Sequence, residues 1–254
     1  MKILLSNDDG ILSPGLLALA KGLYEAHELV IAAPDSERSA ASHSLTFASP
    51  LRVNEAKLAG LEGISAYAIS GTPADCVKVA LGNLCEKPDM VISGINHGAN
   101  KGTDVFYSGT VSAAMEGAML GIPSIAISNV SYRPNRFEAC IEAVRYTMAI
   151  MERDGYRSMM MNVNAPDVAA KDIKGFVITP AGKQAYENRF HECVDPRRQK
   201  YYWAPVVRLT KCGPEEDNDE RWTNEGYATI TPLLMDLTDY SSIKRLLALK
   251  EDMI

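Results

Sequence analysis

Two adjacent aspartates, Asp8 and Asp9, follow directly on a short apolar run at residues 2–6. Neighbouring carboxylates repel each other, and a divalent cation relieves that repulsion. Carboxylate oxygens are hard ligands of the kind that suit Mg²⁺, Mn²⁺ or Ca²⁺. The alternative is that the pair only caps a turn ahead of the helix expected from Pro14, as Asp-Gly sequences often do. The pair predicts a metal site, and the turn stays open as the other interpretation.

A second polar segment, Ser108-Gly109-Thr110, leads directly into a helix expected at residues 111–120. Free backbone N–H groups and two hydroxyls at a helix N-terminus favour a phosphate group. Plain N-capping of the helix by the same hydroxyls is the equal alternative. The sequence contains no Walker loop and no HExxH, GxSxG or CxxC motif, and no GxGxxG follows the first apolar run. Phosphate binding here is therefore predicted without a dinucleotide-cofactor motif.

Two further loops follow apolar runs and carry neutral oxygen ligands. The loop 34–43 contains Ser39 and His43, and the loop 94–100 contains Asn96 and His97. A hard cation takes hydroxyl and amide oxygens beside carboxylates, so these loops strengthen the prediction of a metal site. The two histidines are equally open to contact with a ligand and to a bystander role.

The elements that must position these loops alternate between strand and helix up to about residue 170. Expected strands are 2–6, 28–33, 89–93, 125–128 and 159–163, and expected helices are 14–27, 72–84, 112–120 and 137–153. This order predicts a doubly wound, mostly parallel α/β sheet of the Rossmann-like kind. Ligands bind such sheets beyond the carboxyl ends of the strands, so the polar loops should converge there.

The pattern of expected elements changes after about residue 175. Strand patterns at 176–179, 201–203, 206–210 and 227–231 have little helix between them, and a final helix is expected at 241–250. The charged segment 189–200 is expected to be an excursion, and the acidic run 215–220 a solvated loop. We expect one domain over residues 1–254, with an α/β core to about 170 and a β-rich extension from about 175.

The composition restricts partners and compartment. The chain has 254 residues, a net charge of −6 at pH 7 and a pI of about 5.3, whereas a protein that grips a nucleic-acid polymer needs a basic surface. We expect no signal peptide and no membrane span, which would need ~18 apolar residues. The five cysteines have no metal-binding or disulfide spacing and are expected to be reduced. A cytoplasmic protein without membrane or nucleic-acid partners follows by elimination.

These segments together resemble the SurE family, and the likeness runs in order from residue 2 to about 240. The matching motifs are KILLSNDDG at 2–10 with Gly15, Ala33-Pro34 with Ser36, Ser39 and Ser42, SGTPADCV at 70–77, SGINHG at 93–98, YSGTV at 107–111, AMEG at 114–117, GIP at 121–123, DPR at 195–197, Tyr202-Trp203, and GY at 226–227 with TPL at 231–233. An ordered set of this length is far more specific than any single motif.

The resemblance implies a metal-dependent phosphatase that hydrolyses nucleoside 5′- and 3′-monophosphates, with some activity on short polyphosphate. It implies one divalent ion per subunit, Mg²⁺ or Mn²⁺, with Ca²⁺ as a substitute in crystals. By matching position, the metal ligands are Asp8, Asp9, Ser39 and Asn96. By the same matching, the phosphate-binding residues are Ser108, Gly109, Thr110, Asn96 and His97. A homodimer or homotetramer that exchanges the C-terminal extension between subunits is also implied.

Three positions depart from the family pattern. His97 stands where the family usually has Arg, and Ala99 where it often has Pro, which leaves less positive charge on the phosphate side. Trp222 replaces a common small residue near Asp219, which changes the packing of the extension. The implied metal ligands are all intact.

Direct attack of metal-bound water on phosphorus is the favoured mechanism, because no cysteine or histidine stands at an obvious nucleophile position. Asp8 or Asp9 would accept the proton, and the backbone N–H groups of Gly109 and Thr110 would meet charge on the equatorial oxygens. Two other functions fit the same loops. One is a glycosyltransferase that holds a metal on a nucleotide-sugar diphosphate, and the other is a nucleotide sensor that binds without turnover.

Overall fold

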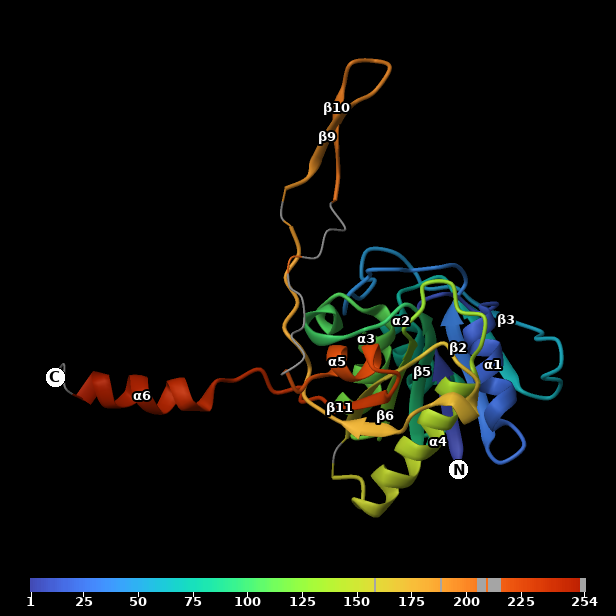
Figure 1. Ribbon diagram of the computed structural model, residues 1–254. Coiled ribbons are helices and arrows are strands. Elements are labelled where there is room, and N and C mark those ends of the chain that lie inside the picture. Colours follow the sequence, from blue (N-terminus) through green and yellow to red (C-terminus); the bar gives the residue numbers. More distant parts are fainter. Residues whose placement is uncertain (158, 188, 205–208, 210–215, 252–254) are drawn as a thin grey trace.

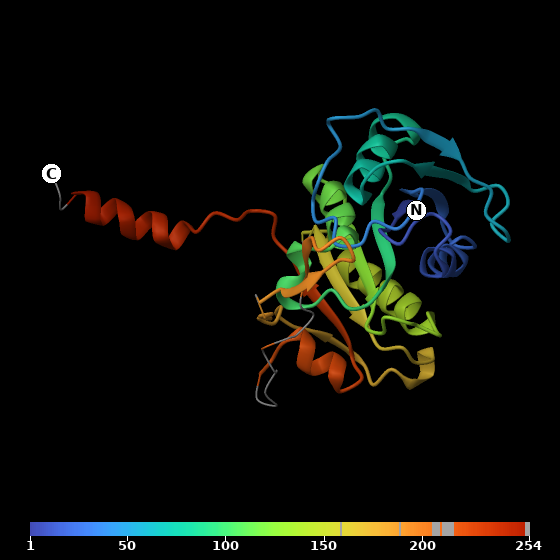
Figure 2. The same cartoon turned by 90° about the horizontal axis from the view of Figure 1, so that it is seen from above.

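The structure is a computed structural model of the chain and describes residues 1–157, 159–187, 189–204, 209 and 216–251. One large sheet carries helices on both of its faces, and a hairpin and the C-terminal helix project from this body (Figures 1 and 2). The predicted doubly wound, mostly parallel α/β fold is confirmed. The strand predicted at 206–210 lies outside the described residues except for Leu209.

The elements are distributed between sheet, hairpin and helices as follows. The strands of the main sheet are β1 (Lys2–Ser6), β2 (Glu28–Pro34), β3 (Val53–Glu55), β4 (Ser65–Ile69), β5 (Met90–His97), β6 (Ser124–Asn129), β7 (Met160–Ala165), β8 (Phe176–Ile178) and β11 (Ala228–Pro232). The hairpin strands are β9 (His191–Val194) and β10 (Lys200–Trp203). The helices are α1 (Pro14–Leu23), α2 (Pro73–Val79), α3 (Gly109–Met119), α4 (Glu138–Arg153), α5 (Asp219–Asn224) and α6 (Tyr240–Glu251).

The strand order decides where the polar loops meet. The order is β3-β4-β2-β1-β5-β6-β7-β11-β8, so β1 lies between β2 and β5 and pairs with both in parallel. Ser6 at the end of β1 is in register with Ser93 in β5. The chain moves outward in one direction through β2 and β4 and in the other through β5 and β6. A crevice opens beyond the carboxyl ends of the strands at such a reversal point, which here lies between β1 and β5.

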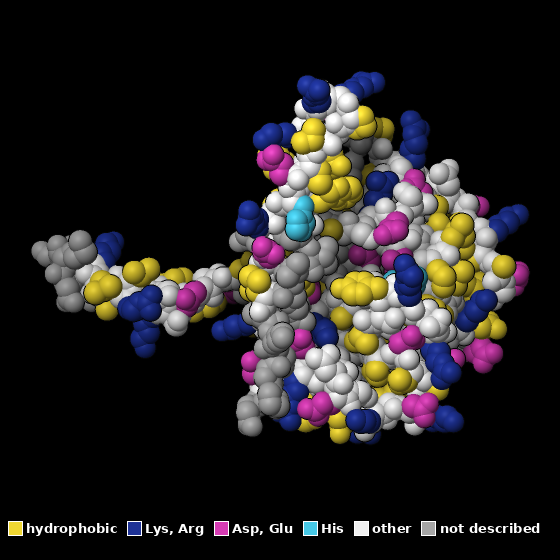
Figure 3. Space-filling view, turned by 45° about the horizontal axis from the view of Figure 1, so that its top comes forward, with side chains coloured by type: hydrophobic (Ala, Val, Ile, Leu, Met, Phe, Trp, Pro, Cys, Tyr) yellow, Lys and Arg dark blue, Asp and Glu magenta, His cyan; other side chains and the backbone are white. Residues whose placement is uncertain are grey.

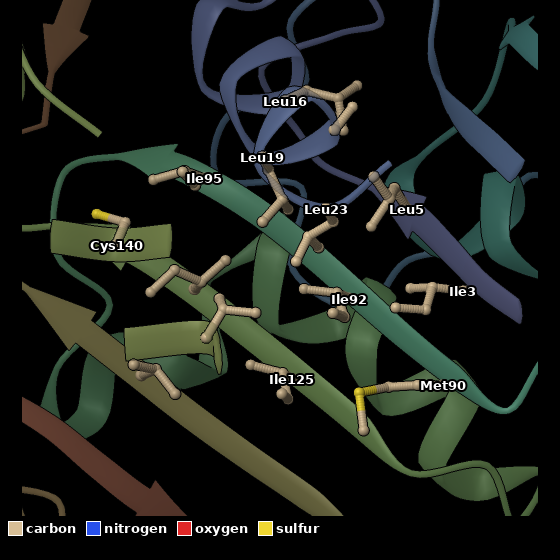
Figure 4. Close-up of a cluster of buried hydrophobic side chains, with 14 of the residues drawn as sticks. Ile3, Leu5, Leu16, Leu19, Leu23, Met90, Ile92, Ile95, Ile125 and Cys140 are labelled. Atoms are coloured by element: carbon tan, nitrogen blue, oxygen red, sulfur yellow. The ribbon is translucent and has the colours of Figure 1, made fainter. Parts of the chain in front are cut away.

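The central strands are apolar along their whole length because both of their faces are covered. Ile3 and Leu5 of β1 face the core under α1 and α4, whereas Leu4 faces the core under α2. Figure 4 shows Leu16 and Leu19 of α1 lying over this first core. Apolar side chains three to four residues apart give α1 one buried face, which fixes the helix and the loop before it to the sheet.

Most expected elements are present, with shifted ends. The helix expected at 72–84 divides into α2 and a π-helical turn at Ala80–Leu84, and α3 begins at Gly109. Strands β3 and β4 were not predicted from the sequence. These strands lie at the edge of the sheet, where β3 has no buried residue and therefore lacks the apolar pattern of a central strand.

The extension joins the main sheet. β11 pairs antiparallel with β7, and β8 pairs parallel with β11, so the C-terminal strands continue the α/β core beyond β7. The charged segment 189–200 is an excursion, as expected, in the form of the β9–β10 hairpin (Figure 1). Helix α6 stands away from the sheet in both ribbon views, with hydrophobic side chains visible along it in Figure 3.

The described cysteines are free, as expected. They are Cys76, Cys85, Cys140 and Cys193, and Cys212 lies outside the described residues. Burial raises the pKa of the Cys76 and Cys140 thiols far above the usual range, so both are inert core side chains. None of the helices in the described part of the chain has both the length and the apolar character that a membrane crossing requires.

Candidate functional site

The loop after β1 places Asp8 and Asp9 at the reversal point of the sheet. Asp8 is almost fully buried, and the Thr110 hydroxyl donates a hydrogen bond to its Oδ1. Gly109 permits this approach, because a Cβ at that position would lie 2.8 Å from the Cβ of Asp8. The backbone N–H of His97 donates a hydrogen bond of 3.3 Å to Asp9 Oδ2. The ends of β1 and β5 and the N-terminus of α3 therefore meet at the aspartate pair.

Both carboxyl groups are held in a setting that disfavours their charge. Burial raises the pKa of Asp8 to about 6, hydrogen bonds from Thr110 oppose the rise, and the charge of Asp9 adds to it. Burial raises the pKa of Asp9 to about 6, with the His97 N–H opposing and the charge of Glu37 adding. Buried neighbouring carboxylates of this kind are stabilised when a cation binds between them.

Each aspartate of the pair lines a different cavity. Asp8 lines a cavity of about 330 Å³ at the carboxyl ends of the strands. Asp9 and Glu37 line a second cavity of about 350 Å³, and His97 lines both. Among the described residues that line these cavities there is no lysine and no arginine. Negative charge therefore dominates the site, and neutralisation has to come from a bound cation or from backbone N–H groups.

Asn96 and Ser39, predicted as neutral ligands, both line the cavity that Asp8 lines. The Asn96 Nδ2 group donates to the backbone oxygen of Gly98 at 2.8 Å, which orients the side chain and leaves its Oδ1 as the ligand atom. The Ser39 hydroxyl donates to Glu37 Oε1 at 2.6 Å. Three of the four predicted ligands thus line one cavity, and Asp9 lines the neighbouring cavity, which shares His97 with the first.

Hydrogen bonds join the loop that carries Ser39 to the segments on both sides of the site. The N–H of Arg38 donates to the backbone oxygen of Asp8 at 2.7 Å. Ser42 donates from its N–H to the oxygen of Tyr107 at 3.1 Å and from its hydroxyl to the oxygen of Phe106 at 2.6 Å. These contacts join the loop after β2 to the segment that leads into α3.

The predicted phosphate-binding segment forms the start of α3. The Ser108 hydroxyl accepts a hydrogen bond of 3.1 Å from the N–H of Val111, so N-capping, one of the two interpretations, is present. Ser108 also lines the main cavity. The helix N-terminus carries partial positive charge and is aimed at Asp8, so it offers favourable electrostatics for an anion at this end of the cavity.

The histidines of the polar loops have different surroundings. His97 lines the main cavity beside Asn96, and burial lowers its pKa, although Glu37 and Asp8 favour its charged form. Its ring is therefore neutral near pH 7. His43 lies instead with its Nε2 at 2.8 Å from Glu116 Oε1 and lines a different cavity, beside Phe106 and Met115. Of the two, only His97 is in contact with the main cavity.

Several further residues complete the site, of which Ala40, Gly98, Ala99 and Asn100 lie in the two predicted polar loops and the others were not predicted as site residues. The additional residues lining the main cavity are Ala40, Gly98, Ala99, Asn100, Asp104, Tyr107, Tyr132 and Tyr186. Tyr186 comes from the extension, and its hydroxyl donates to Asp104 at 2.8 Å. Tyr132 comes from the loop between β6 and α4. Tyr132 follows the carboxyl end of the parallel strand β6, so its position was an available signal in the sequence, whereas Tyr186 lies in the extension, away from the parallel strands of the core.

The acidic run 215–220, expected to be a solvated loop, includes a buried carboxylate. Asp219 starts α5 and accepts hydrogen bonds from the backbone N–H groups of Gly102 and Gly182 at 2.8 and 2.9 Å. It is fully buried, so the solvated interpretation is wrong at this position. Asn218 caps the helix from its side chain, and this cap was the available signal in the sequence. Asp219 links the extension to the segment that leads toward Ser108.

The donor set decides which ion the site fits. Among the described residues there is no group of three or more His, Cys, Asp or Glu side chains that could hold a metal ion. A zinc site of the usual nitrogen and sulfur type is therefore not formed by them. Two carboxylates with a serine hydroxyl and an asparagine oxygen form a hard oxygen set, which fits Mg²⁺, Mn²⁺ or Ca²⁺.

Comparisons with known proteins agree with this architecture. The family described as Survival protein SurE matches residues 3–188. A 5′-nucleotidase SurE of Synechococcus elongatus is 42% identical over 255 residues, covering 97% of this chain and 98% of the relative. A 5′-nucleotidase SurE of Natranaerobius thermophilus is 45% identical over 249 residues, covering 95% of each chain. The crystal structure of the Sure protein from Aquifex aeolicus superposes with a TM-score of 0.84 at 38% identity, covering 98% of this chain and all of that one.

Proposed function

From the premise that the chain belongs to the SurE family, we propose that it is a phosphohydrolase that releases phosphate from nucleoside 5′-monophosphates. The observation that carries the proposal is the pair of adjacent carboxylates, the buried Asp8 and the half-buried Asp9, at the carboxyl end of β1 beside the N-terminus of α3. Relatives that the chain matches over nearly their full length carry the name 5′-nucleotidase, which supports the same substrate class.

The activity we propose depends on one divalent ion, Mg²⁺ or Mn²⁺. The residues that would hold it are Asp8, Asp9, Ser39 and Asn96. Two adjacent carboxylates with raised pKa values, one buried and one half-buried, in cavities whose described lining has no lysine or arginine, support this assignment. When bound, the ion supplies positive charge for the phosphoryl oxygens and makes water a stronger nucleophile at neutral pH.

The side chains and backbone divide the remaining tasks. The N-terminus of α3 binds the phosphate oxygens through the N–H groups of Gly109 and Thr110 and the hydroxyl of Ser108. Asp8 or Asp9 accepts the proton of the attacking water. Thr110 keeps Asp8 in place through its hydroxyl hydrogen bond, and the neutral His97 ring closes the wall without adding charge. Asn96 orients the phosphate from the β5 side.

The proposal includes two secondary activities that the family resemblance implies. These are hydrolysis of nucleoside 3′-monophosphates and hydrolysis of short polyphosphate. A polyphosphate carries several charges, whereas the described lining of the cavity offers no lysine or arginine to meet them. We therefore expect single phosphate groups to be preferred. The cytoplasmic location expected from the composition stays a prediction.

We also propose that the chain works as a homodimer or homotetramer. The apolar side chains of α6 and of the segment before it are exposed, and a second copy would cover them. The exchange of the extension between subunits, as implied by the resemblance, would provide that cover.

Phosphate release from adenosine 5′-monophosphate is the experiment that tests the function. We expect release with Mn²⁺, its loss after addition of a chelator, and recovery on adding the metal back. Binding of the nucleotide without release would favour the nucleotide sensor. Turnover of a nucleotide sugar without release of phosphate from the monophosphate would favour the glycosyltransferase. Either result would contradict the proposal.

A further inference from the structure

The main cavity has an aromatic part that the hydrolysis of a phosphate group does not use. Tyr107, Tyr132 and Tyr186 line it together with the polar residues. Tyr186 is fixed, because its hydroxyl donates to both carboxylate oxygens of Asp104 at 2.8 Å. Tyr132 and Tyr107 are 80% and 65% exposed, so large aromatic surfaces are open to solvent at the rim of a polar site. Such surfaces point to a flat, apolar part of a ligand.

The ring of Tyr132 is seated on the strand that carries Asn96. Gly98, at the end of β5, has a φ of +107°, and a Cβ there would lie 2.8 Å from both Cδ1 and Cε1 of Tyr132. The glycine therefore lets one side of the ring lie directly on the backbone. The side chain is still 80% exposed, so the surface of the ring that is turned away from Gly98 stays available for stacking. Gly98, which the ring contacts, follows Asn96 by two positions, and Tyr132 and Asn96 line the same cavity.

The loop that carries Tyr132 is held in place before any ligand arrives. The Asn129 side chain accepts from the N–H of Ser131 at 2.9 Å and donates to the oxygen of Arg136 at 2.9 Å. The Asp167 carboxylate accepts from the N–H of Arg136 at 2.9 Å. The N–H of Gly98 donates to the oxygen of Asn129 at 3.0 Å, which joins this loop to β5. A ring in a pre-organised loop binds a flat partner at low entropic cost.

We propose that Tyr132 is the stacking platform for the base of the substrate, an inference that rests on the proposed action on nucleoside monophosphates. With the phosphate at the N-terminus of α3 and Asp8, the ribose spans the cavity and the base lies on the Tyr132 ring. Every base has a flat π face, so such a platform accepts all of them. Purines expose a larger face than pyrimidines and should therefore be preferred.

The test compares a substrate that has a base with one that lacks it. Adenosine 5′-monophosphate and ribose 5-phosphate share the phosphate and the sugar. For Tyr132→Ala we expect kcat/KM for the nucleotide to fall roughly tenfold, mainly through KM, while kcat/KM for ribose 5-phosphate changes less than about twofold. Tyr132→Phe keeps the ring and should restore the nucleotide value. Tyr24→Ala, which removes an exposed tyrosine remote from the cavity at the end of α1, is the matched control.

The outcomes separate this inference from the proposed function. An equal loss on both substrates would overturn the stacking role, because the ring would then act on the phosphate or sugar end. If the wild-type protein released phosphate from neither substrate, the proposed function would fail. In that case calorimetric titration with adenosine 5′-monophosphate and Mn²⁺ still decides the inference. Weaker binding by Tyr132→Ala, restored in Tyr132→Phe, supports the platform, and equal or absent binding in all variants contradicts it.

Discussion

The central sheet and the C-terminal end of the chain differ in which groups lack a partner: carboxyl groups at the end of β1 lack an opposite charge, and apolar side chains at the C-terminal end lack cover. In β6 and β7 every residue is buried, and apolar side chains cover both faces of the central strands. After β11, Leu234 and Leu237 are 85% and 83% exposed, and the leucines of α6 are more than half exposed. The core hides its apolar surface but holds the buried Asp8 and the half-buried Asp9, whose pKa values are raised. The extension satisfies its buried Asp219 with backbone N–H groups but leaves apolar surface uncovered.

Each region is therefore incomplete in a different way. The carboxylates at the end of β1 lack positive charge, which a divalent cation supplies. The apolar face of α6 lacks cover, which a second copy of the chain supplies. A cavity of about 290 Å³ beside the Ser42–His43 loop has Met115, Met119 and Leu234 in its wall, so apolar surface continues from the extension onto α3. The comparison predicts that changes in the first region act on catalysis and changes in the second on assembly.

Asp8→Asn should have the largest effect. The amide keeps an oxygen for the Thr110 hydroxyl, so the fold should be retained, whereas the loss of an anionic ligand should lower activity by more than about a hundredfold. Phosphate release from adenosine 5′-monophosphate at saturating Mn²⁺ measures it. Asp172→Asn, an exposed aspartate away from the cavities, is the control. Substantial activity of Asp8→Asn at low metal concentration would remove Asp8 from the metal site.

Removing α6 should act on assembly. A chain that ends at Thr238 lacks the helix and should shift toward monomer, with its Tm lower by roughly 5 °C. Sedimentation at micromolar concentration and a thermal scan measure both effects. Leu247→Glu puts a charge among the exposed apolar side chains of the same helix and should act in the same direction, whereas Lys244→Glu should not. A monomeric full-length protein, or an unchanged oligomer after truncation, would show that α6 has no role in assembly.

The sequence predicted the central strands well because their apolar runs result from burial on both faces, which any order of strands would require. It did not predict the order itself, which depends on how far each crossover carries the chain. Nor did it predict β3, whose three residues are all exposed and carry no apolar pattern. The end of α2 was also placed too late, since the change to a π-helical turn at Ala80 has no marker in the sequence.

The candidate site was predictable where it follows the strand ends. Asp8 and Asn96 could be paired because parallel strands bring their carboxyl ends to one edge. Tyr132 follows the end of the neighbouring parallel strand β6 and was open to the same argument, whereas Tyr186 reaches the cavity from the extension, whose path depends on tertiary contacts such as the one with Asp104. Asp219 was missed for a related reason: an acidic run is usually solvated, and only the two backbone N–H groups supplied by distant loops make its burial favourable.

Asp219 is the residue that tests whether the two regions act separately. Its carboxylate binds Gly102, ahead of the phosphate-binding segment, and Gly182 in the extension. Asp219→Ala leaves two buried N–H groups without this acceptor and should lower the free energy of unfolding by about 2–4 kcal/mol. Urea unfolding measures this loss, and kcat should fall as well because the segment toward Ser108 loosens. Glu25→Ala, at an exposed position after α1, is the control. Full activity in a folded Asp219→Ala protein would separate the extension from catalysis.

The smallest expected effect is the pH dependence of stability in the metal-free protein. The pKa of Asp8 is about 6 in the folded chain, above the ~3.9 of an aspartate in an unfolded chain, so folding favours the protonated form. This contribution is complete below about pH 4 and is lost as the pH rises through about 6, since the buried carboxyl must then ionise. Without metal, Asp8→Asn should therefore exceed the wild type in stability by about 1–2 kcal/mol at pH 7.5, and this advantage should shrink by about 1 kcal/mol at pH 5.

Urea unfolding of both proteins in chelator at the two pH values measures this advantage, and saturating Mn²⁺ provides the complementary measurement. Metal binding to the folded state stabilises the protein that binds it more tightly, so Mn²⁺ should reverse the order and make the wild type the more stable protein. A wild type that is the more stable of the two in chelator at pH 7.5 would mean that Asp8 is stabilised by the fold itself. The core would then be complete without a cation, and only the extension would need a partner.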